Sequence, residues 1–169
     1  MNQNYKTELQ FGLLTGLFSF LWLLGEYFLG LHSKYIDYQP VITNFALIIP
    51  IIIFPLGIKA KRKLDYNGHI TFWQALQAGM VMSVIWGALS VMGVFIYYKT
   101  INPGWYDFVI AHYKAVGPSR GMNAKEAEEY AKMYFSMKSY MSQALFGSIA
   151  AGGFISLIAA RLLRTKTKY

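Results

Sequence analysis

Four stretches of this chain are long and apolar and contain no charged residue. They are residues 9–25, 41–58, 70–98 and 141–160. An α-helix rises ~1.5 Å per residue and a bilayer's hydrocarbon core is ~30 Å thick, so about twenty apolar residues cross it. Four buried helices of a soluble bundle are the alternative, but these would carry a polar stripe, which is missing over most of each stretch. The sequence therefore predicts an all-α, four-transmembrane-helix bundle.

We expect a single domain over residues 1–169, and its composition agrees with a membrane protein. Only 14% of the residues are charged, against roughly 25% in a soluble domain, and 17% are aromatic, which suits two water–lipid boundaries. The first stretch exceeds the usual signal-peptide core, and no small-x-small cleavage motif follows it before Lys34. A retained helix is therefore expected there. The expected helices cover about 9–31, 41–58, 70–98 and 141–163, with an amphipathic helical outer loop at 99–140.

Basic residues cluster after the second and the fourth apolar stretch. The clusters are Lys59, Lys61, Arg62 and Lys63, and then Arg161, Arg164, Lys166 and Lys168. Short loops rich in Lys and Arg stay in the cytoplasm, so we predict that both termini are cytoplasmic. Given this much apolar sequence, the net charge of +8 favours anionic lipid headgroups over nucleic acid as a partner.

Small residues recur four positions apart along three of the expected helices. In lipid, helices associate through close contact and hydrogen bonds, and small residues mark the interfaces. Packing within the chain is the main interpretation, and a homodimer seam is the alternative. The residues are Gly12 and Gly16 in the first helix, Gly79, Ser83 and Gly87 in the third, and Ser148, Gly152 and Ser156 in the fourth.

The second helix contains two prolines, Pro50 and Pro55. Each lacks a backbone donor and crowds the carbonyl one turn earlier, which predicts a kinked helix. Carbonyls freed in this way can line a polar cavity together with Thr43 and Asn44. A role limited to shaping the packing is the other interpretation.

The expected outer loop contains two amphipathic pieces separated by the sequence GPSRG. In residues 102–117, Pro103 suits a first helical turn. In residues 123–141, Asn123 can cap a helix with Glu126 as its capping-box partner. We expect both pieces on the outer leaflet or over the helix ends, with a lid or docking surface as the alternative. The expected apolar faces are Trp105, Phe108, Val109 and His112 in the first piece and Ala127, Tyr130, Tyr134, Met137 and Met141 in the second. An ion pair is expected between Glu128 and Lys132.

Glu26 is the candidate intramembrane ionisable residue, and such residues are functional candidates by default. Counted from Leu9, it lies ~26 Å along the helix axis, near the outer boundary. The main interpretation is an interfacial carboxylate that pairs with Lys34 or a lipid amine. The alternative is the proton-binding carboxylate of a transporter.

No motif for catalysis or cofactor binding is present, so we expect no enzyme activity, no cofactor and no metal. The chain has no cysteine, and GPSRG lacks the ending of a phosphate loop. No serine lies in a nucleophile-elbow setting. A metal site formed by His32, Asp37 and His112 is the one alternative that the histidines leave open.

Several stretches resemble a known family. They are NGHITFWQALQAG at 67–79, FIYYKTINPGW at 95–105 and FGSIAAGGFISLIAARLLRTK at 146–166, and the similarity runs along the chain from FGLLTGLF onward. They are similar to the bacterial integral-membrane domain-of-unknown-function family 4199, common in Bacteroidota. The resemblance implies a four-span inner-membrane protein with a long loop before the last helix. It implies no activity, substrate or catalytic residue.

Our interpretation is a non-enzymatic inner-membrane protein that acts through protein contacts, as an accessory or structural subunit. The alternative is a small proton-linked dimeric transporter that uses Glu26 and the kinked second helix. Replacement of Glu26 by Gln distinguishes them, because only the transporter needs the carboxylate.

Overall fold

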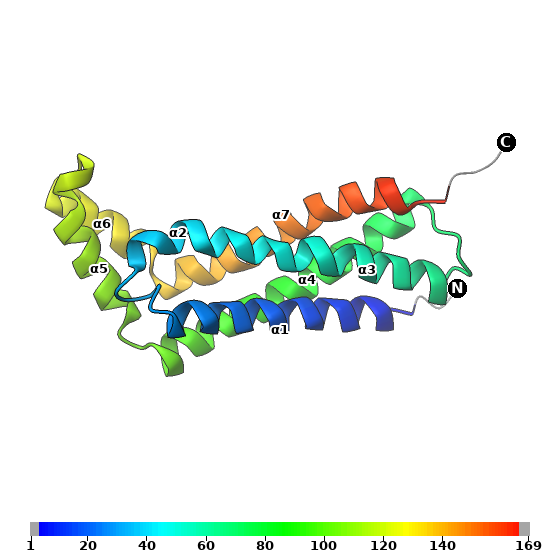
Figure 1. Cartoon of the computed structure of the whole chain (residues 1–169), viewed down its shortest axis with the longest axis horizontal. Coiled ribbons are helices and arrows are strands. Elements are labelled where there is room, and N and C mark those ends of the chain that lie inside the picture. The colour runs from blue at the N-terminus through cyan, green and yellow to red at the C-terminus, as the bar shows by residue number, and fades with distance from the viewer. Residues whose placement is uncertain (1–3, 166–169) are drawn as a thin grey trace.

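The structure is a computed structural model that describes residues 4–165, and four long helices run side by side along its long axis (Figure 1). They are α1 (Lys6–Phe28), α3 (Ile48–Leu64), α4 (Phe72–Ile96) and α7 (Met137–Leu163). With the short helical segments that continue them, the four candidate spans are Lys6–Phe28, Ile36–Leu64, Phe72–Ile101 and Met137–Leu163. Each is long and apolar enough to cross a membrane, which confirms the helical membrane bundle.

The second span is a series of helical segments and not one regular helix. A 3₁₀ turn at Ile36–Tyr38 leads into α2 (Gln39–Ile42), and a 3₁₀ segment at Thr43–Leu47 joins α2 to α3. Pro55 lies inside α3 as predicted. Pro50 also lies in α3, but in its first turn, where its missing N–H costs no hydrogen bond.

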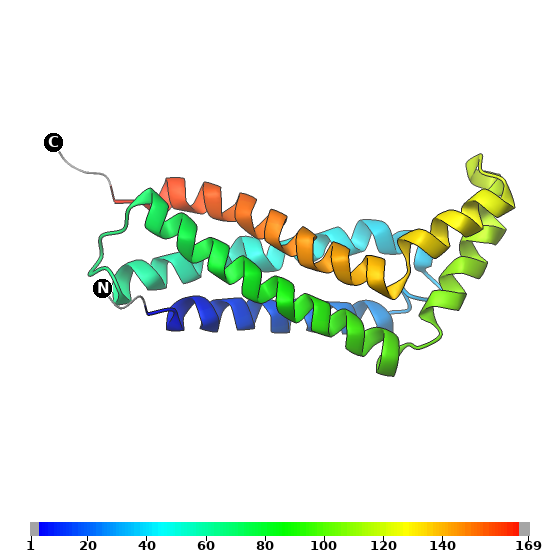
Figure 2. The same ribbon diagram turned by 180° about the vertical axis from the view of Figure 1, so that it is seen from behind.

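Helix α4 is central, since it contacts α1, α3 and α7, and its contact with α7 is the most extensive in the bundle. Figure 2 shows α7 beside α4 from the back of the molecule. A Cβ added to Gly152 would lie 2.9 Å from Ser83 Cβ and 2.8 Å from Phe54 Cε2, and one added to Gly79 would overlap the side chain of Ser156. The helices therefore touch here because these positions carry little or no side chain.

The remaining small residues named from the sequence also lie between helices. Gly12 faces Ile85 of α4, Gly16 faces Leu89, Gly87 faces Leu145 of α7, and Ser148 donates a 3.3 Å hydrogen bond to Ser90. The small-residue positions are thus occupied by contacts within the chain, and they are not an exposed seam.

Helices α5 (Trp105–Val116) and α6 (Ala124–Tyr134) form a helical hairpin at one end of the bundle, the hairpin end (Figure 1). Asn123 caps α6 with Glu126 in a capping box, as predicted. The single helix expected over 123–141 is wrong, because the chain breaks after Tyr134 and Ser136 caps α7. Met137 and Met141 consequently belong to the last span.

The buried face of α6 also differs from the predicted one. Ala127 and Ala131 are fully buried and Phe135 is 5% exposed, whereas Tyr130 and Tyr134 are each 39% exposed. Phe135 joins a cluster of aromatic residues at the hairpin end that includes Tyr97, Tyr98 and Trp105. The burial of that ring sets which side of α6 faces inward.

Helix α1 begins and α7 ends at the opposite end of the bundle, the termini end (Figure 1). The basic residues expected to follow the second helix instead form its last turns, because α3 continues to Leu64. Lys61 is 5% exposed and pairs with Glu8 Oε1 at 2.9 Å and Asp65 Oδ2 at 2.8 Å. Lys166 and Lys168 lie outside the described residues.

Candidate functional site

Glu26 lies in the last turn of α1 at the hairpin end, and only 4% of it is exposed. Trp22 Nε1 donates a 2.6 Å hydrogen bond to its Oε1, and the Thr43 hydroxyl lies 2.7 Å from both carboxylate oxygens. The Nε2 atom of His32 is 3.2 Å from Oε2. Three polar groups from separate parts of the chain therefore hold the buried carboxylate, as such a group requires.

The expected pairing of Glu26 with Lys34 or a lipid amine is wrong. Lys34 is exposed, and its ammonium lies 5.0 Å from the ring centre of Tyr35. The pairing differs because the chain reverses sharply after α1 and carries His32 back toward the carboxylate. The burial then removes Glu26 from contact with lipid headgroups.

A tight turn makes this return possible. Gly30 has φ +79°, a left-handed conformation that favours glycine. Its carbonyl accepts a 2.8 Å bond from the Tyr35 N–H, and the Leu31 N–H donates to the Glu26 carbonyl at 2.9 Å. His32 follows at once and is 5% exposed.

His32 also connects the site to α4. Its Nδ1 atom is 2.5 Å from the Tyr97 hydroxyl, which accepts a 2.8 Å bond from Asn102 Nδ2. Tyr97 can then donate to Nδ1, and a neutral His32 protonated on Nε2 donates to Glu26. Tyr97 opens a π-helical turn, Tyr97–Ile101, a feature that is frequent at functional sites.

The indole of Trp105, the first residue of α5, covers this cluster. It is 2% exposed, and its ring centre lies 4.8 Å from that of His32 and 6.4 Å from that of Tyr97. The hairpin is therefore attached directly to the buried polar residues. We call Glu26, His32, Thr43, Tyr97 and Trp105 the Glu26 cluster.

A cavity of about 160 Å³ borders the Glu26 cluster, and Ser19, Gln39 and Tyr140 add further polar groups to its lining. That volume accommodates a few water molecules or a small ion and is below the range typical of drug-sized ligands. A larger recess of about 510 Å³ shares Gln39, Thr43 and Tyr140 with it. The two hollows therefore meet at these side chains, and Thr43 stands between the recess and the carboxylate.

The other polar residues named from the sequence are distributed differently. Asn44 donates to the Pro40 carbonyl at 2.7 Å and lines only the larger recess. His112 Nε2 lies 3.1 Å from Asp37 Oδ1, which also accepts a 2.6 Å bond from Arg120, while His32 belongs to the Glu26 cluster. The suggested metal trio is therefore not assembled, and residues 4–165 contain no group of three or more potential ligands.

The hairpin carries a charged cluster centred on Glu128. Its carboxylate lies 2.7 Å from the ammonium of Lys114 on α5 and 2.5 Å from that of Lys132, which confirms the expected Glu128–Lys132 pair. Hydrogen bonds from Lys114 and then Lys132 lower the pKa of Glu128 to about 2. Burial raises the pKa of Tyr113, against the opposing effect of Arg120.

Three members of the site were not identified from the sequence: Trp22, Tyr97 and Trp105. Trp22 precedes Glu26 by one helical turn, and that spacing is a usable signal. Tyr97 approaches His32 only through tertiary packing, since 65 positions separate them. Trp105 was assigned only to an apolar helix face.

The sequence model of one protein family matches residues 10–165, and its description is "Protein of unknown function (DUF4199)". The match covers most of α1 and all of the other helices, the hairpin included. No curated protein and no solved structure matches the chain.

Proposed function

The chain belongs to the DUF4199 family of proteins of unknown function, and on that premise we propose that it is a non-enzymatic accessory or structural subunit of the bacterial inner membrane. In this proposal it contacts another protein through hairpin α5–α6. The proposal places both termini in the cytoplasm, and the exposed basic residues Lys59, Lys63, Arg161 and Arg164 at the termini end support that orientation. The hairpin then lies on the opposite side of the membrane.

The observation that carries this proposal is the construction of the hairpin. Helices α4 and α7 are antiparallel neighbours, and such helices are usually joined by about 2–8 residues. Residues 102–136 instead form a folded unit, fixed by Trp105 at the Glu26 cluster and by a 2.7 Å bond from the Tyr98 hydroxyl to the Phe135 carbonyl. Long ordered connections are usually functional.

The exposed face of the hairpin suits contact with a protein. Met133 is 70% exposed and Phe108 is 41% exposed. The hairpin also carries exposed charged residues, including Lys125 and Glu129. Apolar side chains within a polar rim are the usual composition of such a surface.

Purification of the protein at its native level in a mild detergent, followed by intact-mass analysis, tests this function. The expected result is that a second protein co-purifies with the wild-type chain in a stoichiometric amount. It should not co-purify with the Met133→Glu variant. His69→Glu changes an exposed residue at the termini end and should retain it. A wild-type protein that purifies alone, or a partner that both variants retain, contradicts the proposal.

A proton-linked dimeric transporter is the second candidate, and the cavity at Glu26 favours it. The carboxylate, the His32 ring and the Tyr97 hydroxyl form a continuous series of groups that can exchange protons. In this case Glu26→Gln abolishes pH-dependent proton flux in proteoliposomes, whereas Asp37→Asn, an exposed carboxylate variant, does not. The intact-mass experiment should then show a homodimer, and normal flux in Glu26→Gln excludes the transporter.

A further inference from the structure

A lateral groove lies between the second and the fourth span. Its volume is about 630 Å³, and the described residues that line it are apolar except for Lys59. One wall runs from Leu47 to Lys59 and the other from Ala151 to Leu163. Pro55 on one wall and Ala151 and Ala159 on the other are small or compact side chains, which leave the space between the helices unfilled.

The length of this α3–α7 groove corresponds to one leaflet of a bilayer. At ~1.5 Å per residue, the wall from Leu47 to Lys59 extends about 18 Å. Half of a ~30 Å hydrocarbon core is about 15 Å. A groove of this length, with its charged residue at the termini end, suits one extended acyl chain below a headgroup.

The charges around Lys59 favour an anionic headgroup. Lys61 is occupied by Glu8 and Asp65, the two acidic residues at the termini end. Arg62 donates a 3.1 Å bond to the Leu163 carbonyl. Among residues 4–165, no carboxylate lies within ion-pairing distance of Lys59, so its ammonium is available to a ligand.

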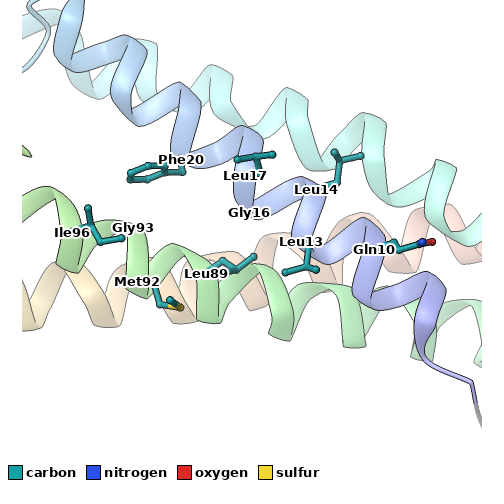
Figure 3. A pocket seen from close by; sticks show the side chains of 10 residues that line it. All are labelled: Gln10, Leu13, Leu14, Gly16, Leu17, Phe20, Leu89, Met92, Gly93 and Ile96. Carbon is teal, nitrogen blue, oxygen red and sulfur yellow. The ribbon is translucent and has the colours of Figure 1, made fainter.

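A second lateral groove, between α1 and α4, provides a contrast (Figure 3). It is of similar volume, about 570 Å³, and Leu13, Leu17, Phe20 and Met92 are typical of its lining. Among the described residues, Gln10 is the only polar side chain that lines it. Nothing in that groove distinguishes one headgroup from another.

We propose that the α3–α7 groove holds one acyl chain of an anionic phospholipid whose phosphate binds Lys59. A basic residue near the membrane surface attracts anionic lipids, and an ammonium donates charge-assisted hydrogen bonds to phosphate. A lipid seated here contacts the second and the fourth span at once. Its binding should therefore stabilise the folded bundle against unfolding.

The test uses delipidated full-length protein in detergent, titrated with phosphatidylglycerol or with phosphatidylcholine of the same acyl chains. Native mass spectrometry counts the bound lipids, and thermal unfolding reports the stabilisation. We expect phosphatidylglycerol to bind more tightly and to raise the unfolding temperature. Lys59→Gln should weaken its binding about fivefold. Lys63→Gln is the matched control, an exposed lysine at the same end that does not line the groove, and it should change binding less than twofold.

Ala151→Phe fills the groove and should abolish tight binding of phosphatidylglycerol. Because that variant can disturb the fold, a photoreactive acyl-chain phosphatidylglycerol is also cross-linked to the wild-type protein, and the label is expected within 47–59 or 151–163. The proposal would be overturned if the two lipids bound equally or if the two lysine variants lost the same amount of phosphatidylglycerol binding. It would also be overturned if the label were confined to other segments.

Discussion

The imidazole of His32 lies 3.2 Å from the carboxylate of Glu26, and each side chain is 4% exposed. Burial of two such groups carries a large desolvation cost, which only good geometry and additional hydrogen bonds offset. Trp22 and Thr43 supply those bonds to the carboxylate, and Tyr97 supplies one to the imidazole. Glu26 is therefore a residue that positions other parts of the chain as well as a titratable group within a span.

The first prediction concerns the coupling within this pair. Glu26→Gln should lower the free energy of unfolding by about 1–3 kcal/mol, because three donors lose a charged acceptor. His32→Leu should also lower the free energy of unfolding. The double variant should lose less free energy than the two single variants together, with a coupling energy of about 0.5–3 kcal/mol. Unfolding in mild detergent measures all three, with Asp37→Asn as the exposed control. Strict additivity would show that the two residues do not interact.

The second prediction concerns the contact between α4 and α7. Gly152→Ala should destabilise the bundle by about 1–3 kcal/mol, because the new methyl group would lie 2.9 Å from Ser83 Cβ. Gly147→Ala on the same helix adds a methyl group with no atom within 4 Å and should be neutral or slightly stabilising. Thermal unfolding of the two variants in one detergent compares them. Equal effects would contradict the packing described for α4 and α7.

The third prediction concerns Lys61, which is buried between Glu8 and Asp65. Lys61→Met should cost about 3–5 kcal/mol, because it leaves the Glu8 carboxylate, 3% exposed, without its cation. Adding Glu8→Met should recover much of the loss. Lys63→Met, which alters an exposed side chain one position beyond Arg62, should have little effect on unfolding. A Lys61 variant as stable as the Lys63 variant would show that the pair does not stabilise α1 against α3.

The fourth prediction concerns acid. The pKa of Glu128 is lowered in the folded state to about 2, from an ordinary value near 4.5. The contribution of Glu128 to the stability of the folded state is therefore complete above pH ~4.5, and it is lost as the pH falls from there to about 2. The protection of the α5 and α6 amides against hydrogen exchange, taken relative to the intrinsic exchange rate at each pH, should therefore fall across that interval. Glu128→Gln should reduce this pH-dependent loss of protection and Glu129→Gln should not, so the same acid response in both variants would locate its origin elsewhere.

The four spans were predictable because apolar length is a property of each segment alone. The start of α6 was equally local: Asn123 Oδ1 accepts from the Glu126 N–H at 2.8 Å, as its spacing indicated. The end of α6 was missed, although Ser136, which accepts a 3.2 Å bond from the Ser139 N–H, is a capping residue within MYFSMKS. The helix propensity of the sequence favoured a helix that continued past Tyr134, whereas the burial of Phe135 favoured a break there.

The Glu26 cluster was not predictable in the same way. Its contacts depend on the left-handed Gly30 turn, on the π-helical turn that begins at Tyr97, and on the approach of α5 to α1. No single segment contains that information. A carboxylate near the end of an apolar stretch therefore suggested contact with lipid, whereas in the folded chain the Glu26 carboxylate contacts His32.

The central place of α4 has a consequence for biosynthesis. Its most extensive partner, α7, is the last of the four described spans to leave the ribosome, so the Gly79 and Ser83 face stays open until α7 has been synthesised. When α7 packs on α4, the Thr165 N–H donates a 2.8 Å bond to the Ile70 carbonyl, and the Ile70 N–H donates a 2.9 Å bond to the Thr165 hydroxyl. The final residues of the described chain thus complete the assembly, and a nascent chain halted before α7 would be inserted but still unfinished.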